Sequence, residues 1–193
     1  MKKQIKVTLI VIVAAIIAAA IIWYVMYLRG KEQDLLTPVG TRAEFIGDTD
    51  KYPTMLTAKG TQILNADGEQ VVLKGVMVPE SRSLYEEKKF NEDFYKDVFA
   101  KGGNAIRVPI SPVEYKNDDY YMWRYLDRIV TWAGENDNYV ILDWDYTGNP
   151  IDGSGDEMPD LDENPLDYSA EFWKNIADYF KNTPNVIFEI YNE

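Results

Sequence analysis

The chain has 193 residues, a formal net charge of −12, and neither cysteine nor histidine. Without cysteine it has no disulfide framework and no thiol nucleophile, and without histidine it has no imidazole base or ligand, so acid–base chemistry falls to carboxylates or tyrosine. The acidic balance argues against nucleic acid as a partner, because phosphate binding needs clustered Lys and Arg, and it suits a neutral substrate. The length allows one domain with appendages but is below the roughly 250 residues of a complete (β/α)8 barrel.

The first distinctive segment is an apolar run over residues 7–28, interrupted only by Thr8. At about 1.5 Å per residue, this run is long enough to cross the roughly 30 Å hydrocarbon core of a bilayer. The flanking Lys and Arg residues favour, by a small margin, a cytoplasmic N-terminus. We therefore predict that residues 1–29 form a transmembrane anchor and that the rest of this single-pass protein is extracytoplasmic. The alternative is a signal peptide cleaved near the small residues 18–20, which gives a secreted protein.

Residues 30–55 are polar, contain prolines and glycines, and show no sustained periodicity, so we expect a linker or a strap against the following domain. From residue 56 the pattern changes. The segments Gln62-Ile63-Leu64 and Val71-Val72-Leu73 flank the sequence Asn65-Ala66-Asp67-Gly68, a turn signal, and together they predict a β-hairpin.

Beyond the hairpin, short apolar runs alternate with amphipathic segments. The expected strands are 74–78, 104–108 (closed by Pro109), 139–142 and 186–191, and the expected helices are 91–101, 120–135 and 169–181. This order predicts an α/β fold with a parallel sheet covered by helices, over residues 56–193. Periodicity alone does not separate a doubly wound sheet from a barrel, but no Gly-rich phosphate loop follows the first strand, which disfavours nucleotide binding.

The loop over residues 146–165 is acidic and rich in Gly and Pro. The run from Asp152 to Glu163 invites comparison with a calcium loop, yet its spacing lacks the EF-hand pattern, so a solvated loop is favoured. We expect neither a metal site nor a cofactor.

In parallel α/β folds, ligands bind at the carboxyl ends of the strands. Those ends carry charged, amide or aromatic residues: Pro79-Glu80, Arg107, Asp143 to Tyr146, and Asn192-Glu193. The set suits sugar chemistry, in which one carboxylic acid protonates a glycosidic oxygen while a second carboxylate attacks or activates water. Asn can bind a sugar 2-hydroxyl, and aromatic faces can stack on a pyranose ring.

Four segments in this order resemble glycoside hydrolase family 5, the cellulase-like barrels of clan A. They are Leu73-Lys74-Gly75-Val76, Gly103 to Pro109, Val140 to Trp144, and Phe172-Trp173 through Pro184 to Glu193. The resemblance implies a (β/α)8 TIM barrel, here truncated after the fourth strand, and a retaining mechanism on β-linked polysaccharides. It implies Glu193 as the acid/base, Asn192 as the partner of the 2-hydroxyl, and Arg107 as the residue that orients the nucleophile. Candidates for substrate binding are Trp144, Tyr146, Tyr115 and Asp145.

Two departures from the family pattern matter. Asp145 stands where the family usually has His, and no residue matches the nucleophile, a Glu at the end of the seventh strand. Glu189 alternates to the other side of its strand, so we interpret it as a barrel-interior or packing residue rather than a catalyst. Arg107 has a second interpretation, as the partner of a structural carboxylate.

Two other functions remain open: a non-catalytic, membrane-anchored carbohydrate-binding protein, and another clan A glycosidase. A half barrel leaves two sheet edges unpaired, so we expect the chain on its own to aggregate or dimerise and to show no hydrolysis.

Overall fold

The computed structural model describes residues 2–39, 50–152, 154, 161 and 164–192. The chain divides into two compact units, residues 1–37 and residues 38–193.

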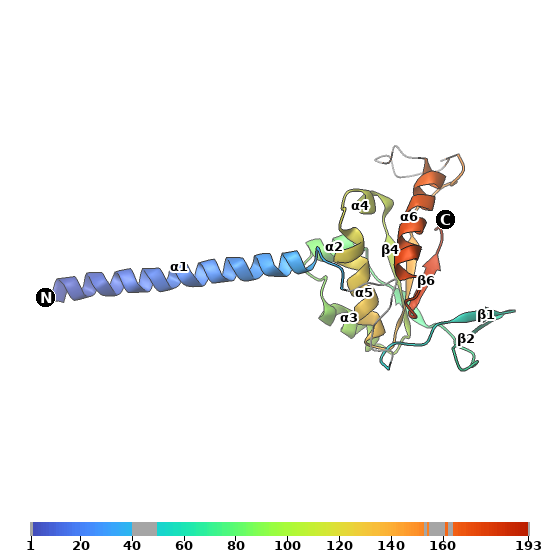
Figure 1. Cartoon of the computed structure of the whole chain (residues 1–193), viewed down its shortest axis with the longest axis horizontal. Coiled ribbons are helices and arrows are strands. Elements are labelled where there is room, and N and C mark those ends of the chain that lie inside the picture. Colours follow the sequence, from blue (N-terminus) through green and yellow to red (C-terminus); the bar gives the residue numbers. More distant parts are fainter. Residues whose placement is uncertain (1, 40–49, 153, 155–160, 162–163, 193) are drawn as a thin grey trace. The chain divides into compact units, whose positions relative to one another are not determined.

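The first unit is dominated by helix α1, Lys2–Asp34 (Figure 1). Its apolar side chains from Val11 onward are exposed, including Trp23, which is 69% accessible. Of the described residues, Val11–Asp34 form a helical stretch long and apolar enough to cross a membrane, a property that a signal sequence near the N-terminus shares.

The second unit is built on a parallel sheet of four strands, which confirms the expected strand order. The strands are β3 (Gly75–Met77), β4 (Ala105–Ile110), β5 (Tyr139–Trp144) and β6 (Val186–Glu189), and they lie side by side in this order. Neighbouring strands are parallel because a helical crossover returns the chain to the same end of the sheet before the next strand begins.

Helical segments separate the strands (Figure 1): α2 (Ser81–Glu86), α3 (Glu92–Phe99), α4 (Pro112–Lys116), the π-helical turn η2 (Met122–Leu126), α5 (Asp127–Gly134) and α6 (Pro165–Phe180). The short helices α2 and α4 were not expected. Helix α6 begins four residues earlier than expected, because Asn164 Oδ1 accepts hydrogen bonds from two backbone N–H groups of its first turn and Pro165 occupies the first helical position.

One face of the sheet is covered by helices and forms the core. Alternate residues of β4 and β5 point to that face and are almost fully buried: Ile106, Val108, Ile110, Val140, Leu142 and Trp144. Phe172 of α6 stacks on Trp144 with 3.9 Å between ring centroids. The buried Asn185 side chain donates to the carbonyl oxygens of Val130 and Asn138, at 3.0 and 3.2 Å, and so ties the start of β6 to α5 and to the loop before β5.

The hairpin lies elsewhere than expected. Its strands are β1 (Thr57–Lys59) and β2 (Gln62–Leu64), joined through Gly60, whose φ of 62° favours glycine. The expected turn over residues 65–68 is present, but the strand expected over 71–73 is reduced to one bridge between Leu64 and Gln70. The reason is local. The Asn104 side chain accepts from Lys74 N at 2.7 Å and donates to Val72 O at 3.1 Å, so this segment is bound to the parallel sheet instead.

Pro109 does not close its strand, contrary to expectation. It lies inside β4, in register with Asp143. Odd-numbered residues of β4 direct their backbone groups towards β3, since Val78 N donates to Arg107 O. Because β3 ends at Met77, Pro109 faces no strand partner that needs its missing N–H, and proline is tolerated there.

Residues 52–54, at the start of the second unit, pack against its helices and sheet. Tyr52 is 8% exposed, and a Cβ atom added to Gly134 of α5 would lie 1.9 Å from its ring. The Tyr139 hydroxyl donates to Thr54 O at 2.8 Å. This part of the segment therefore forms a strap against the domain.

Candidate active site

The sheet face opposite the helices carries a cluster of charged residues from three neighbouring strands. Arg107 of β4 is in register with Ile141, and Asp143 of β5 is in register with Glu189 of β6. Because side chains alternate along each strand, all three charged residues project from the same face. They lie near the carboxyl ends of the strands, where ligands bind in parallel α/β folds.

Arg107 is the hub of this cluster. Its Nε lies 2.8 Å from Glu189 Oε2 and its Nη2 lies 2.8 Å from Glu189 Oε1, a two-pronged pairing. Nη2 also donates to Asn192 Oδ1 at 3.1 Å. The hydrogen bonds to Glu189 are the main cause that raises the pKa of Arg107, and burial opposes this rise. The same hydrogen bonds lower the pKa of Glu189.

Asp143 lies beneath this pair and is fully buried. Its Oδ2 is 3.0 Å from Arg107 Nη2, an ion-pair distance, yet neither carboxylate oxygen has an aligned hydrogen-bond donor among the described residues. Burial raises the pKa of Asp143 to about 7; the positive charge of Arg107 opposes the rise, and the carboxylates of Glu189 and Asp145 add to it. Asp143 is thus a buried acid that titrates near neutrality.

Asn192 is fixed at three points. Its Oδ1 accepts from Arg107, its Nδ2 donates to Asp145 Oδ1 at 2.7 Å, and its backbone N donates to Trp144 O at 3.1 Å. Asp145 in turn donates its backbone N–H to Ile110 O at 3.1 Å. The structure therefore brings together three of the expected site residues, Arg107, Asn192 and Asp145. Glu193, the expected acid/base, lies outside the described residues.

Glu80, which the sequence placed at the same rim, has partners of its own. One carboxylate oxygen caps helix α2 by accepting from Ser83 N at 2.9 Å, and the other accepts from the Tyr121 hydroxyl at 2.7 Å. Tyr121 is fully buried, and burial raises the pKa of its hydroxyl. These contacts make Glu80 a connection between α2 and the aromatic core.

Two expected substrate-binding aromatics are core residues. Trp144 is 0% exposed, stacks on Phe172, and donates from Nε1 to Ser169 Oγ at 2.8 Å. Tyr146 is 1% exposed and stacks on Tyr191 with 5.6 Å between centroids. Neither offers a free ring face to a sugar, which corrects the expectation that they form subsite walls.

Tyr115, the third expected aromatic, lies on the helix-covered side of the sheet. Its ring contacts Trp144 and Phe172 edge to face, at centroid distances of 5.9 and 4.9 Å. It is therefore separated by the sheet from the face that bears Arg107 and Glu189, and the structure does not bring it to the charged cluster.

Asp143 was expected at the strand ends without a role, and Glu189 was expected as a barrel-interior or packing residue; both contact Arg107. The period of two along strands was the available signal, since it places residues 107, 143 and 189 on one face once the register is known. Among the described residues, no group of three or more Asp or Glu side chains could hold a metal ion.

Comparison with known proteins gives a family. A family model described as Cellulase (glycosyl hydrolase family 5) matches residues 64–193. Endoglucanase A of Butyrivibrio fibrisolvens is 29% identical over 159 residues, which are 74% of this chain and 32% of that protein. Endoglucanase C of Evansella cellulosilytica is 26% identical over 192 residues, covering 86% of this chain and 23% of that protein.

Solved structures show the same architecture. A β-glucanase from Saccharophagus degradans, crystallised in complex with cellotetraose, superimposes with a TM-score of 0.68 at 25% identity and covers 76% of this chain and 44% of that one. The catalytic domain of the Thermobifida fusca endoglucanase Cel5A has a TM-score of 0.56 at 22% identity, over 80% of this chain and 45% of that one. The chain therefore spans less than half the length of these structures, and about a quarter to a third of the two endoglucanases.

Proposed function

Because the chain belongs to glycosyl hydrolase family 5, the cellulase family, we propose that it carries the acid/base side of a retaining active site for β-linked glucans. The observation that carries the proposal is the network from Glu189 through Arg107 and Asn192 to Asp145, at the carboxyl ends of three parallel strands. In this network a cation, an amide and two carboxylates are held in fixed positions at the carboxyl end of the sheet, where ligands bind in parallel α/β folds.

Asn192 has the hydrogen-bonding capacity that the proposal needs. A side-chain amide has two N–H donors, and Asn192 Nδ2 donates one of them to Asp145 Oδ1. The second can donate to the 2-hydroxyl of a sugar, a contact that strengthens in the oxocarbenium-like transition state. Glu193, the next residue, is the proposed acid/base that protonates the leaving oxygen and later activates water.

Asp145 has a role that fits a carboxylate. A histidine at this position would present a donor, whereas Asp145 accepts from Asn192 Nδ2. With Arg107 donating to Oδ1 of the same amide, the two charged residues fix which end of Asn192 is oxygen and which is nitrogen. Asp145 is therefore a positioning residue in the proposed site. It stands where the family usually has a histidine, and it accepts a hydrogen bond where a histidine would donate one.

The nucleophile of the pair is not assigned to Glu189 or Asp143. Glu189 is engaged by Arg107 through both oxygens, and Asp143 is fully buried with a pKa raised to about 7. The two carboxyl groups of a retaining site lie about 5–5.5 Å apart across the scissile bond. We propose that the opposing carboxylate belongs to barrel strands other than the four described.

The apolar helix α1 supports an extracytoplasmic location. We propose that it anchors the protein in the membrane and leaves the sheet domain outside the cytoplasm, where polysaccharide is met. Secretion after removal of the segment is the alternative, and both give the domain access to a polymeric substrate.

A hybrid barrel tests the proposed activity. Residues 38–193 would replace the matching region of the Saccharophagus β-glucanase, whose remaining strands complete the barrel. A hybrid with cooperative thermal unfolding is expected to release shorter sugars from cellotetraose, and Asn192→Ala is expected to lower kcat/KM by about 10²-fold or more through loss of transition-state contacts. Asp167→Ala, an exposed change on α6, serves as the control. A folded hybrid that binds cellotetraose without cleaving it would support the carbohydrate-binding alternative instead.

A further inference from the structure

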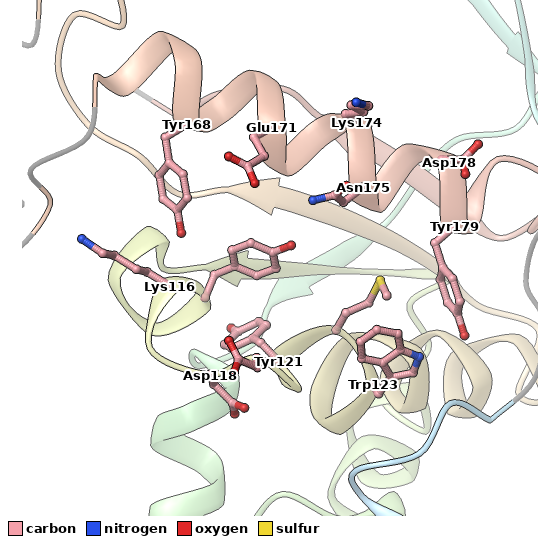
Figure 2. A pocket seen from close by; sticks show the side chains of 13 residues that line it. Lys116, Asp118, Tyr121, Trp123, Tyr168, Glu171, Lys174, Asn175, Asp178 and Tyr179 are labelled. Carbon is pink, nitrogen blue, oxygen red and sulfur yellow. The ribbon is translucent and has the colours of Figure 1, made fainter.

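The helix-covered side of the domain contains a groove that the proposed catalytic network does not use. It lies between α6 and the segment formed by α4 and η2, and its volume is about 1020 Å³ (Figure 2). Tyr115 is one of its lining residues, and it packs on Trp144 on the side of the sheet opposite Arg107. The volume is at the upper end of the roughly 300–1,000 Å³ typical of small-molecule sites, so the groove has room for an oligomeric ligand.

Aromatic rings line the groove along its length. At one end Trp123 of η2 and Tyr179 of α6 face each other edge to face, with 6.4 Å between centroids (Figure 2). Towards the other end Tyr168 projects from α6, and its hydroxyl donates to Pro112 O at 3.2 Å. Trp123, Tyr168 and Tyr179 are each only partly buried, so part of each ring remains accessible.

Polar groups lie between these rings. Glu171 and Asn175, both exposed, project from α6 into the groove (Figure 2). Asn175 and the Tyr115 hydroxyl both line the groove; burial is the main cause that raises the pKa of that hydroxyl, and Asn175 opposes the rise. The hydroxyl therefore stays protonated at physiological pH. The groove thus offers a carboxylate acceptor, an amide and phenolic hydroxyls beside apolar ring faces.

The charge of the lining excludes several ligand classes. Its charged residues are Lys116, Lys174, Asp118, Asp119, Glu171 and Asp178, which give two positive and four negative charges. Two of these carboxylates are paired with cations beside the groove, Asp118 with Arg124 at 3.0 Å and Asp178 with Lys181 at 2.8 Å. The groove is therefore close to neutral and does not offer the clustered, unpaired cations that nucleic acid and phosphate need. Aromatic faces interleaved with uncharged donors and carboxylate acceptors suit a neutral polyol, whose C–H faces stack on rings while its hydroxyl groups bind the polar side chains.

We propose that this groove is a second carbohydrate-binding site, which holds a neutral oligosaccharide without cleaving it. That the sugar is a β-linked glucan rests on the proposed function, whereas the site itself rests on the groove. The two sites lie on opposite sides of the sheet. One protein molecule can therefore bind one polysaccharide chain in the groove and a second polysaccharide chain at the carboxyl ends of the β-strands.

The test uses the full chain in micelles of a detergent without a sugar headgroup, titrated with cellotetraose. The chain has five tryptophans, so five indole N–H resonances can be assigned by Trp→Phe substitution. The Trp123 resonance is expected to shift with saturation, while that of Trp132, which packs against Tyr95 and Phe90, stays in place. The double substitution Glu171→Ala and Asn175→Ala is expected to weaken binding at Trp123 by about tenfold, because each removes a polar contact.

Two controls separate this site from the charged cluster. Asp167→Ala removes an exposed carboxylate on the same helix outside the groove, and it should leave binding at Trp123 unchanged. Arg107→Ala should also leave it unchanged, even though it disrupts the proposed catalytic network. The inference fails if cellotetraose leaves Trp123 unperturbed, or if Arg107→Ala abolishes the perturbation and the groove substitutions do not. A loss of hydrolysis in the hybrid barrel with Trp123 binding intact would count against the proposed catalytic function alone.

Discussion

Arg107 and Glu189 are joined by two parallel hydrogen bonds of 2.8 Å, which link strand β4 to strand β6 across the intervening β5. The pairing takes place above Asp143, the β5 residue in register with Glu189. One guanidinium therefore holds the two outer members of a three-strand layer and also orients Asn192.

Replacing Arg107 by Lys tests how much this geometry contributes. A lysine keeps the charge but presents one ammonium group in place of the planar fork, so the two-pronged contact and the bond to Asn192 cannot be made together. We expect the free energy of unfolding to fall by about 1 kcal/mol, a modest value because both side chains are partly exposed. Urea denaturation measures the change.

The matched control for this substitution is Arg82→Lys on helix α2. Arg82 pairs with Glu86 at 2.8 Å, but the pair is more exposed and its pairing uses a single nitrogen. We expect a change below about 0.5 kcal/mol there. Equal losses at the two positions would mean that the fork geometry at Arg107 adds nothing.

Asp143 makes stability depend on pH. Its pKa in the folded domain is about 7, above the ordinary value of 3.8, so the folded state binds more protons than the unfolded state between about pH 4 and pH 7. The free energy of unfolding is therefore expected to fall as pH rises through this window, by of the order of 1–4 kcal/mol. Asp143→Asn should flatten this dependence and raise stability at pH 8, as followed by urea denaturation at pH 5, 6.5 and 8.

Glu189→Gln provides the contrast of opposite sign. Arg107 lowers the pKa of Glu189, so its contribution is present above the ordinary carboxyl pKa and is lost as pH falls. Glu189→Gln should therefore lower stability at pH 8, where Asp143→Asn raises it. The account of the cluster is contradicted if both substitutions shift stability at pH 8 in the same direction.

The strands and long helices could be predicted from the sequence because each has a simple pattern. The four strands of the sheet are short apolar runs, and α3, α5 and α6 are amphipathic. The short helices α2 and α4 have no such pattern. They are set by single capping residues, Glu80 and Ser111, whose side chains accept from the third residue along.

The candidate site was harder to predict, because its contacts depend on register. Trp144 follows Asp143 at the end of β5, and from sequence both appear to be at the rim. The strand alternation turns Asp143 to the charged face and Trp144 into the helical core. The pairing of Arg107 with Glu189 spans 82 residues and depends on the alignment of three strands, which no local pattern contains.

Trp144→Ala tests the placement of this ring in the core. The indole is fully buried and stacks on Phe172, so its removal leaves a cavity and should lower the free energy of unfolding by about 3–5 kcal/mol. Trp123→Ala, at a partly exposed ring, should cost clearly less. A Trp144→Ala variant with near-normal thermal stability would show instead that the ring is accessible and free to serve a ligand.

The role of helix α1 can be tested by cell fractionation. A protein held by an uncleaved helix is expected to remain in the membrane pellet after extraction at alkaline pH, and its intact mass should retain residues 1–29. Deletion of those residues should abolish the association. A soluble protein that begins shortly after Ala20 would show that the segment is a cleaved signal.

The most direct test of the central claim is Glu193→Gln in the hybrid barrel, with an aryl β-cellobioside as substrate. Glutamine cannot act as an acid or a base. Breakdown of the glycosyl-enzyme intermediate needs a base to activate water, so turnover should fall by about 10²-fold or more. Added azide, which attacks without a base, should restore turnover and yield the β-configured glycosyl azide. Unchanged turnover in the Glu193→Gln variant, or a loss that azide does not restore while the variant unfolds at the parent temperature, would contradict the assignment of Glu193 as acid/base.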